Sequence, residues 1–560
     1  MIVPTADRTK ATVMVKVRFM DKDTFEWTSI GSTMQAQLST IASAPALTNG
    51  QETLNFLRGS RNPQEADGYR VRTFILGDIV DSEPVSVRGA VGSYPDPGYT
   101  AFSGSIASRQ AVVYQGANDG MLHAFDAATG NELWAYVPSL VFPNLSELAS
   151  PNYQHHFYVD GTPAVGDVDF GSGTPSWRTI LVGGLRLGGQ GYYALDITDP
   201  TAGNEGAAAG KVLWEFPNSG TPTQYSTNIG YSFGKPLIVK TAAFGWVVVV
   251  TSGYNNPVGD FRGHLFFLNP RTGQVLKDMV TPLGFGSAAS PVNLAQISGF
   301  VPNPSQGLIV DSIYGGDNLG NVWRFDVLDP DPASWAVYRL ATLTDAVGNP
   351  QPITSAPELT TITNVTPNKR VILIGTGRLL GNSDITDSNI QSIYALVDDR
   401  SAAPTIASPR TQFTQKILTI GAGGVRNVNS DTVDWTNSKG WYFDFPSGER
   451  VTGDPVVAYG SLVLTTNLPS PVACSSGSYL YAVNVATGGQ LPASNFAPGE
   501  TAWTGKYVAQ SLATRPVVVV LPSGQINSLI RAGDGSIVSD RLPLAWSRQV
   551  RKAGWKEIVR

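Results

Sequence analysis

Short runs of apolar or alternating residues recur along this chain, and turn-forming residues separate them. The first group of runs spans residues 84–91, 110–116, 121–126 and 132–137. Asn118-Asp119-Gly120 and Thr129-Gly130 stand between the later runs, and these residue types readily adopt the positive φ that hairpin turns require. The pattern therefore predicts a sheet of four antiparallel strands.

The same layout returns further along the chain. A second group of runs spans 163–168, 178–183, 191–197 and 211–216, and a third spans 236–241, 246–253, 264–269 and 274–278. A fourth group has 312–316 and 321–327 as its middle strands. Helical periodicity is nearly absent apart from residues 33–41, so an almost entirely β chain is predicted.

An X-Pro pair followed by a strand-like run marks the start of each unit. It occurs seven times, at intervals of 55 to 98 residues, with its prolines at Pro84, Pro163, Pro236, Pro291, Pro357, Pro455 and Pro516. Proline suits the first position of a strand because it lacks the N–H that an interior ladder position donates. Seven units with loop insertions are therefore predicted.

Four-stranded units repeated seven times fit a ring better than they fit two stacked β-sandwiches, which is the alternative arrangement. We predict an all-β, seven-bladed β-propeller of four-stranded antiparallel blades over residues 78–560. Residues 1–77 are predicted to be a lead-in segment, the end of a truncated upstream region. Because the last unit has only two clear runs, at 516–521 and 526–532, ring closure is expected to borrow a strand from residues 11–19.

Composition removes several classes of function. The net charge is −5 with no basic run, so the attraction that drives nucleic-acid binding is missing. The single cysteine, Cys474, allows no intrachain disulfide and no Cys-rich metal site. The sequence has no apolar stretch long enough for a transmembrane segment and no signal peptide at its start, which we interpret as a cut from a longer protein.

Several segments, read in order, resemble the C-terminal β-propeller of the PilY/PilC family of type IV pilus proteins. They are Leu54–Gly59, Leu76–Pro84, Gly116–Asp126, Glu132–Pro138, Val159–Pro163, Gly191–Thr198 and Gly315–Asp326. The resemblance implies a non-enzymatic, extracellular factor at the pilus tip or outer cell surface. It implies roles in pilus assembly, in opposing retraction, in twitching motility and in adhesion, with minor pilins, the pilus fibre and surface or host-cell ligands as partners.

Two family features are missing from the sequence. Relatives often carry an acidic calcium loop before the strand that corresponds to residues 311–316, but Gly299–Val310 contains no Asp or Glu, so calcium is not expected there. No Arg-Gly-Asp tripeptide occurs, so integrin binding is not carried over from relatives.

The remaining metal candidates are weak. The densest acidic patch consists of Asp384, Asp387, Asp398 and Asp399, which could collect a cation, although aspartates at turns usually accept from local backbone N–H groups. The four histidines are expected to be surface or loop residues; they are His123, His155, His156 and His264.

Enzymatic interpretations also meet obstacles. Gly230–Gly234 matches the nucleophile-elbow pattern, but a β run follows where a helix is needed. Residues 126–134 resemble the tryptophan-docking repeat of quinoprotein dehydrogenases, yet the later turns Thr272-Gly273 and Thr487-Gly488 lack the following Trp. A quinoprotein-like dehydrogenase and a generic secreted scaffold propeller therefore stay open as alternatives. The insertions 140–158, 420–439 and 490–505 are the predicted recognition loops.

Overall fold

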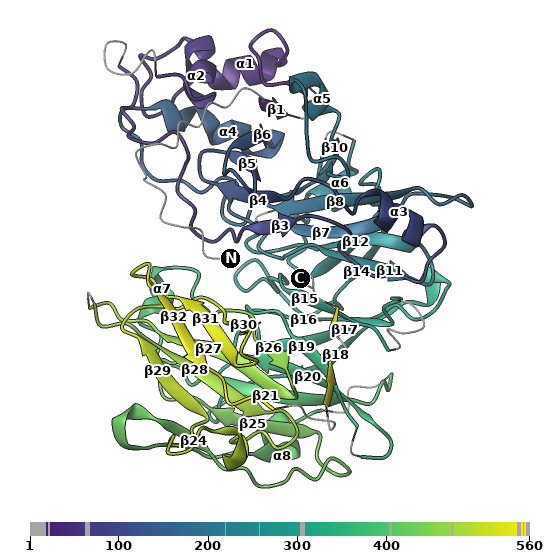
Figure 1. The fold of residues 1–560 in the computed structure, drawn as a ribbon, viewed down its shortest axis with the longest axis vertical. Coiled ribbons are helices and arrows are strands. Elements are labelled where there is room, and N and C mark those ends of the chain that lie inside the picture. The colour runs from purple at the N-terminus through teal and green to yellow at the C-terminus, as the bar shows by residue number, and fades with distance from the viewer. Residues whose placement is uncertain are drawn as a thin grey trace.

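The computed structural model contains seven β-sheets arranged in chain order (Figure 1). It describes residues 18–20, 23–61, 68–218, 220–256, 258–302, 308–363, 365–402, 406–472, 474–545, 550–552 and 554–555. Each sheet is called a blade below. From β7 to β30, the inner strands of consecutive blades contact one another. The predicted seven-bladed propeller is confirmed.

Blades 1 to 3 form the blue and teal half of the molecule in Figure 1. Blade 1 contains β1 (Arg18–Met20), β2 (Asp23–Thr24), β3 (Val85–Val87), β4 (Val112–Ala117), β5 (Met121–Asp126) and β6 (Glu132–Tyr136). Blade 2 contains β7 (Ala164–Asp169), β8 (Trp177–Gly184), β9 (Tyr192–Asp196) and β10 (Val212–Phe216). Blade 3 contains β11 (Leu237–Thr241), β12 (Gly245–Thr251), β13 (His264–Leu268) and β14 (Val275–Val280).

Blades 4 and 5 each gain a strand from the C-terminal segment. Blade 4 contains β15 (Ile297–Phe300), β16 (Ser312–Gly316), β17 (Asn321–Asp326), β18 (Ala336–Thr342) and β34 (Gly554–Trp555). Blade 5 contains β19 (Glu358–Ile362), β20 (Lys369–Gly375), β21 (Ser392–Asp398), β22 (Thr414–Gln415), β25 (Gly440–Asp444) and β33 (Val550–Lys552).

Blades 6 and 7 differ in width. Blade 6 contains β23 (Leu418–Ile420), β24 (Arg426–Val428), β26 (Val456–Ala458), β27 (Ser461–Leu468), β28 (Gly477–Asn484) and β29 (Gly505–Ala509). Blade 7 has three described strands, β30 (Val517–Val520), β31 (Ile526–Arg531) and β32 (Ile537–Arg541).

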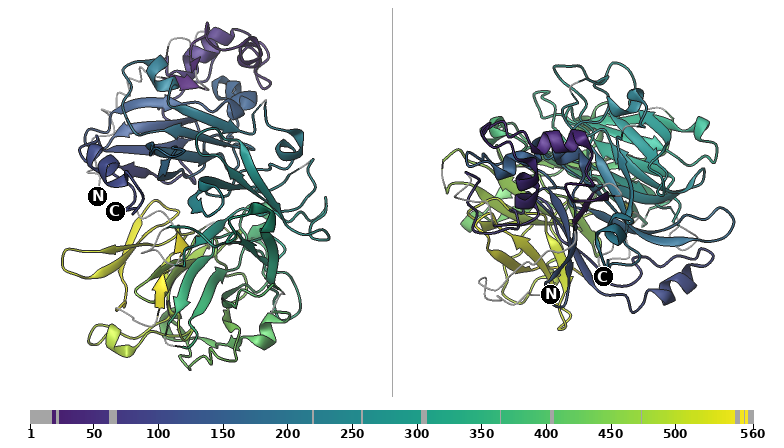
Figure 2. Two further views of the ribbon diagram at one scale, coloured as in Figure 1. Left: turned by 90° about the vertical axis from the view of Figure 1, so that its right-hand side faces the viewer. Right: turned by 90° about the horizontal axis from the view of Figure 1, so that it is seen from above.

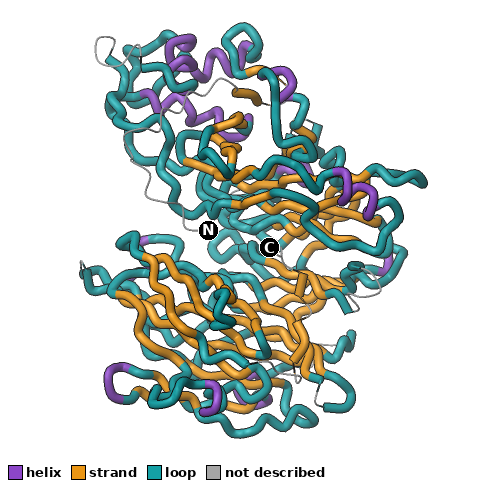
Figure 3. The backbone as a smooth tube through the Cα atoms, viewed as in Figure 1, coloured by secondary structure: helices purple, strands orange, loops and turns teal. Residues whose placement is uncertain are grey.

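Helices are short and gather mainly beside blade 1 (Figure 3). The α-helices are α1 (Ser32–Leu38), α2 (Gly50–Leu57), α3 (Tyr99–Ser105), α4 (Phe142–Leu145), α5 (Glu205–Ala209), α6 (Thr223–Ser226), α7 (Asn382–Ile385) and α8 (Pro409–Gln412). The 3₁₀ turns are η1 (Ser139–Val141), η2 (Ser146–Ala149), η3 (Pro332–Ser334), η4 (Ala422–Gly424) and η5 (Ala493–Asn495). The helix expected near residues 33–41 is confirmed as α1.

Proline marks the start of the inner strand in six of the seven blades. Those strands begin at the residue after Pro84, Pro163, Pro236, Pro357, Pro455 and Pro516. The fourth marker is wrong, because β15 begins at Ile297 and not after Pro291. Val292 and Leu294, which lie between this proline and β15, are buried. Their carbonyls accept from N–H groups in loops of other segments. An apolar run here belongs to a loop, not to the ladder.

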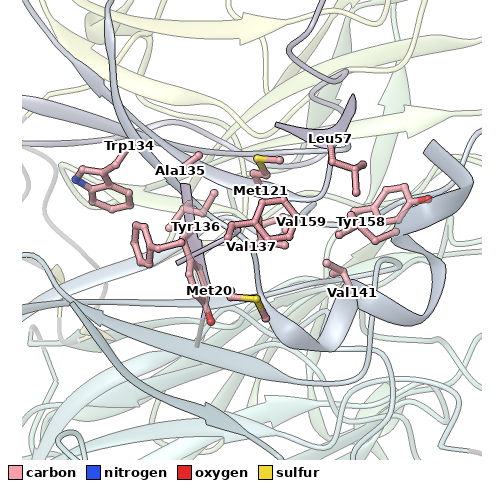
Figure 4. Close-up of a cluster of buried hydrophobic side chains, with 14 of the residues drawn as sticks. Met20, Leu57, Met121, Trp134, Ala135, Tyr136, Val137, Val141, Tyr158 and Val159 are labelled. Atoms are coloured by element: carbon pink, nitrogen blue, oxygen red, sulfur yellow. The ribbon is translucent and has the colours of Figure 1, made fainter. Parts of the chain in front are cut away.

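The largest hydrophobic cluster joins the lead-in segment to blade 1 (Figure 4). Met20 and Leu57 come from the lead-in segment and pack in one cluster with Met121 and Trp134 from the blade. Trp134 is completely buried. Burying a large apolar side chain contributes about 1.5–3 kcal/mol, so this contact fixes the lead-in segment against the blade. The division between residues 77 and 78 stays a prediction.

Ring closure differs from the expectation. Arg18 and Phe19 pair in parallel with Ala135 and Tyr136 of β6, so this part of the expected closing strand widens blade 1. Residues 11–17 lie outside the described residues. The C-terminal strands β33 and β34 instead pair with the inner strands of blades 5 and 4, and Figure 2 shows the yellow C-terminal strands in the same half of the molecule as the green blades.

The predicted recognition loops are partly anchored in the fold. In 140–158, Phe142 and Leu145 are buried in the blade 1 cluster. In 420–439, β24 pairs with β29. In 490–505, Phe496 and Trp503 are buried in a cluster shared with blade 7. Their role in recognition stays a prediction.

Candidate functional site

A carboxylate–arginine network joins blades 4 and 5, and it includes one of the predicted acidic residues. Asp398 stands at the end of β21, and its Oδ1 accepts from the Arg324 guanidinium at 2.6 Å. Both side chains are 1% exposed. The Tyr314 hydroxyl donates to Asp398 Oδ2 at 2.5 Å. Asp398 is therefore fully engaged by a cation and a hydroxyl from blade 4.

A second ion pair extends this network. Arg370 donates to both carboxylate oxygens of Asp311, at 2.9 and 2.7 Å. Burial disfavours the charge of Arg370, but Tyr314 and Asp311 outweigh it and raise the guanidinium pKa above its usual value. Arg400 lies 3.2 Å from Asp311 and 3.1 Å from Asp326. Such bidentate pairs fix geometry as well as charge, so the network works as a clamp between the blades.

A groove of about 540 Å³ opens beside this clamp. Its walls are both apolar and charged, and they include Phe300, Thr361, Lys369, Arg370, Asp399 and Arg400. The Arg370 guanidinium lies 3.6 Å from the centroid of the Phe300 ring. Of the cations that line the groove, Arg370 and Arg400 are both paired with Asp311.

The structure does not bring the four predicted acidic residues together. Asp384 and Asp387 precede β21, whereas Asp398 ends that strand and Asp399 follows it. A seven-residue strand is about 20 Å long. Asp384 pairs with Arg378 at 2.8 Å, and Asp399 pairs with Lys439 at 3.3 Å. Asp387 accepts from the N–H of Asn389 at 2.9 Å. A metal at either end of the strand stays a prediction.

Calcium does not fit the corresponding family loop in this chain. Between β15 and β16, Gly299–Val310 offers no carboxylate, and calcium binds six to eight oxygens that usually include several carboxylates. Asp311, the next residue, is occupied by Arg370 and Arg400. Across the described ranges, no group of three or more His, Cys, Asp or Glu side chains is arranged to hold a metal.

Two histidines correct the expectation that all four are surface or loop residues. His123 on β5 is 2% exposed, with Nδ1 2.6 Å from Glu132 and Nε2 3.0 Å from Asp119. Burial disfavours its charge, but Asp119 and Glu132 outweigh burial and raise its pKa to about 9. Arg18 also pairs with Glu132 at 2.8 Å. This buried ionic cluster ties the lead-in segment to blade 1.

His264 repeats the arrangement in blade 3. Its Nε2 lies 2.9 Å from Asp260 and its Nδ1 lies 3.0 Å from Asp278. Burial opposes the charge, but the hydrogen bonds and charges of Asp278 and Asp260 raise the pKa of His264. In both blades the sequence reads Asp-x-x-x-His-x-Phe, a recurring spacing that could have revealed the pairing.

Three tryptophans dock one blade on the next. The indole N–H of Trp134 donates to Pro200 O at 2.8 Å, and that of Trp214 donates to Pro270 O at 3.0 Å. The indole N–H of Trp441 donates to Val485 O at 2.9 Å. In each case an outer strand contacts a turn in the following blade, so these contacts hold consecutive blades together.

The later Thr-Gly turns also contact tryptophans, although no Trp follows them closely in the sequence. Gly273 packs on Trp214 and Gly488 packs on Trp441, so closely that an added Cβ would lie 2.7 and 2.5 Å from the respective rings. The tryptophan for each turn comes from the preceding blade, not from the residues that follow the turn. The residues that follow each glycine therefore do not reveal this repeated contact.

Ser232 in the nucleophile-elbow pattern has a structural role. Its hydroxyl donates to Gly189 O at 3.2 Å and accepts from the N–H of Leu185 at 2.8 Å. Tyr231 forms a bridge with Tyr254, and β11 follows. The serine is buried and fixes a turn between blades, in agreement with the β context read from the sequence.

The fold and its interblade contacts define a β-propeller whose described sites are ion-pair clamps and tryptophan docks. A family model for the PilY1 beta-propeller domain matches residues 76–422. The chain belongs to this PilY1 β-propeller family.

Named relatives agree with this assignment. The chain is 32% identical over 527 residues to the type IV pilus biogenesis factor PilY1 of Pseudomonas aeruginosa strain PAK, covering 83% of this chain and 43% of the relative. It is 34% identical over 552 residues to a PilY1 homologue of Xylella fastidiosa, covering 93% of this chain and 41% of the relative. The chain thus spans less than half the length of these relatives.

A solved structure shares the fold. The crystal structure of the Pseudomonas aeruginosa PilY1 C-terminal domain aligns with a TM-score of 0.63 at 25% identity, covering 82% of this chain and all of that one. None of the described helices has the length and apolar character needed to cross a bilayer.

Proposed function

We propose that this propeller acts outside the cell, at the pilus tip or outer surface, as a non-enzymatic factor in type IV pilus assembly. It binds minor pilins and the pilus fibre, opposes pilus retraction, and supports twitching motility and attachment to surfaces or host cells. Its similarity to type IV pilus biogenesis factors over most of the chain carries the proposal.

The geometry supports a binding role. Tryptophan docks and the blade 4–5 clamp make consecutive blades rigid, and rigid scaffolds commonly present binding residues on their loops. Several polar side chains of the described clusters are engaged within the protein: Asp398 by Arg324, His123 by two carboxylates, and Ser232 by backbone groups. Such groups stabilise a scaffold and do not need a substrate to satisfy them.

We also propose that the loop at residues 299–310 works without calcium, because it supplies no carboxylate and Asp311 is paired with arginines. The melting temperature of the protein in 1 mM EGTA should equal that in about 1 mM CaCl₂. A melting temperature that is higher in CaCl₂ than in EGTA, with the difference lost in Asp311→Asn, would contradict this proposal. It would place a calcium ion at the loop.

The partner proposal can be tested with purified proteins. The full chain, immobilised, is presented with each minor pilin from the same source and with sheared pili. Binding of at least one minor pilin is expected. Absence of binding to every minor pilin and to the fibre, by a chain that melts cooperatively, would contradict the assembly role and favour a generic scaffold propeller. Quinone-dependent dye reduction by the same preparation would favour the dehydrogenase alternative.

A further inference from the structure

The inner strands of blades 4 and 5 differ from those of the other blades. In the described part of the molecule, β3, β7, β11, β26 and β30 each end their sheet toward the centre of the ring. In contrast, β15 is followed by β34, and β19 is followed by β33. Inner strands of a propeller line its central channel. Two neighbouring blades therefore each accept an additional strand from the channel side.

Both additional strands come from the same C-terminal part of the chain, residues 550–552 and 554–555. Val550, Arg551 and Lys552 pair antiparallel with Ile362, Thr361 and Thr360 of β19. Two residues after Lys552, Gly554 and Trp555 pair antiparallel with Phe300 and Gly299 of β15. One short run thus bridges two blades by backbone pairing.

We infer that the channel-facing edges of β15 and β19 form an acceptor site for an extended peptide strand, and that residues 550–555 are its tethered occupant. The strand edges supply main-chain N–H and C=O groups, which bind any extended segment that can present the complementary groups. Unpaired edges of this kind are templates for a further strand. A segment with proline at the paired positions lacks donors and fits poorly.

The tether explains how so short a segment holds its place. The N–H of Leu542 donates to Ile526 O at 2.9 Å, so the chain is fixed to blade 7 shortly before the segment begins. Attachment in the same chain raises the effective concentration of the segment at the site. The same residues offered as a separate peptide will therefore bind more weakly than the tethered segment and will need the tethered copy to be displaced.

The acceptor site adjoins the groove beside the blade 4–5 clamp. Phe300 and Thr361 belong to the two acceptor strands and also line the groove. The site is thus continuous with a charged wall that includes Lys369 and Arg400. A longer strand than the tethered one would extend from the channel edge into this groove.

The test uses the full chain with the backbone pairing of its own segment weakened. Arg551→Pro/Lys552→Pro removes two backbone N–H groups from the segment, and Arg551→Ala/Lys552→Ala is the matched control that keeps them. The probe is a fluorescein-labelled peptide of residues 548–557, followed by anisotropy. We expect the proline variant to bind the peptide at least tenfold more tightly than the alanine variant does. Equal affinity of the peptide for the two variants would overturn the inference. So would the absence of peptide binding to a proline variant that melts cooperatively.

A crosslink tests occupancy without the proline variant. Thr361 and Arg551 are directly opposite, and Cα atoms of such pairs lie about 4.5–5.5 Å apart, within the range that a disulfide spans. Thr361→Cys/Arg551→Cys in a Cys474→Ser background should form an intrachain disulfide under mild oxidation. The control pair Thr361→Cys/Ser523→Cys should not. Failure of the first pair to crosslink would overturn the assignment of residues 550–555 to the site.

Discussion

The Arg515 guanidinium donates to the Glu83 carboxylate across the junction between the last blade and the first, with Nε and an Nη atom 2.8 and 2.5 Å from its oxygens. Arg515 precedes the proline that starts blade 7, and Glu83 precedes the proline that starts blade 1. The two ends of the repeat therefore meet through the same position of the same motif.

This junction should contribute little to stability, because the Arg515 and Glu83 side chains are 36% and 39% exposed. Exposed ion pairs contribute about 0–1 kcal/mol. We expect Arg515→Ala, Glu83→Ala and the double variant to give a coupling free energy below about 1 kcal/mol in urea unfolding. The coupling should fall further in 1 M NaCl. A coupling above this range would mean that the ion pair itself closes the ring.

Gly488 should be far less tolerant of alanine than Gly130. Both lie in Thr-Gly turns with φ of 72°, so both substitutions carry the same backbone cost, about 1–2 kcal/mol. An added Cβ meets Trp441 at Gly488, whereas it has no neighbour within 4 Å at Gly130. Overpacking costs roughly 1–3 kcal/mol more. The free energies of unfolding of the two variants, measured in urea, should differ by that amount. Equal losses of stability would show that the contact with Trp441 adjusts to the added methyl group without destabilising the protein.

Asp398→Asn should be strongly destabilising, because it leaves the Arg324 guanidinium buried without its carboxylate. Breaking a buried pair costs about 3–5 kcal/mol. Asp399→Asn is the matched control, since Asp399 is 40% exposed and pairs with Lys439 at the surface. Thermal melting should separate the two adjacent variants clearly. Similar melting temperatures would show that the clamp is not a main support of blades 4 and 5.

His123 should make stability depend on pH above neutrality. Its folded pKa of about 9 lies above the ordinary value of about 6.5. Its stabilising contribution is therefore complete below pH 6.5 and is lost as pH rises toward 9, with a slope on the order of 1 kcal/mol per pH unit. The unfolding free energy of His123→Gln should vary less over this range.

His155→Gln provides the comparison, because His155 is an exposed loop residue paired with Asp78 at 2.8 Å. Its unfolding free energy is measured over the same pH range. If His123→Gln retains the full pH dependence of the parent, the buried ionic cluster is not its source, and His264 becomes the group to replace next.

The strands were predictable because their signals are local. The run 121–126 coincides with β5, since turn residues bound it on both sides and alternate residues pack on each face. The fourth proline marker failed because a buried apolar run can be satisfied by loops as well as by a ladder. Single-sequence patterns do not distinguish these two outcomes.

The site was harder to predict because its partners are distant in sequence. Arg324 and Asp398 are 74 residues apart, and only the packing of blade 4 on blade 5 brings them together. Trp214 and Gly273 meet for the same reason, across a blade junction. Asp119 and His123 are four residues apart, so this pair was accessible from sequence through its repetition in blade 3.

The most direct test of the central claim is complementation of a strain deleted for this gene. The full-length protein is compared with a version that lacks residues 78–560, after stable secretion of both has been confirmed. Surface pili and twitching zones are measured. If the propeller acts in pilus assembly, only the intact protein restores both. Equal piliation with the truncated version would contradict the account and would leave the propeller as an attachment or regulatory module.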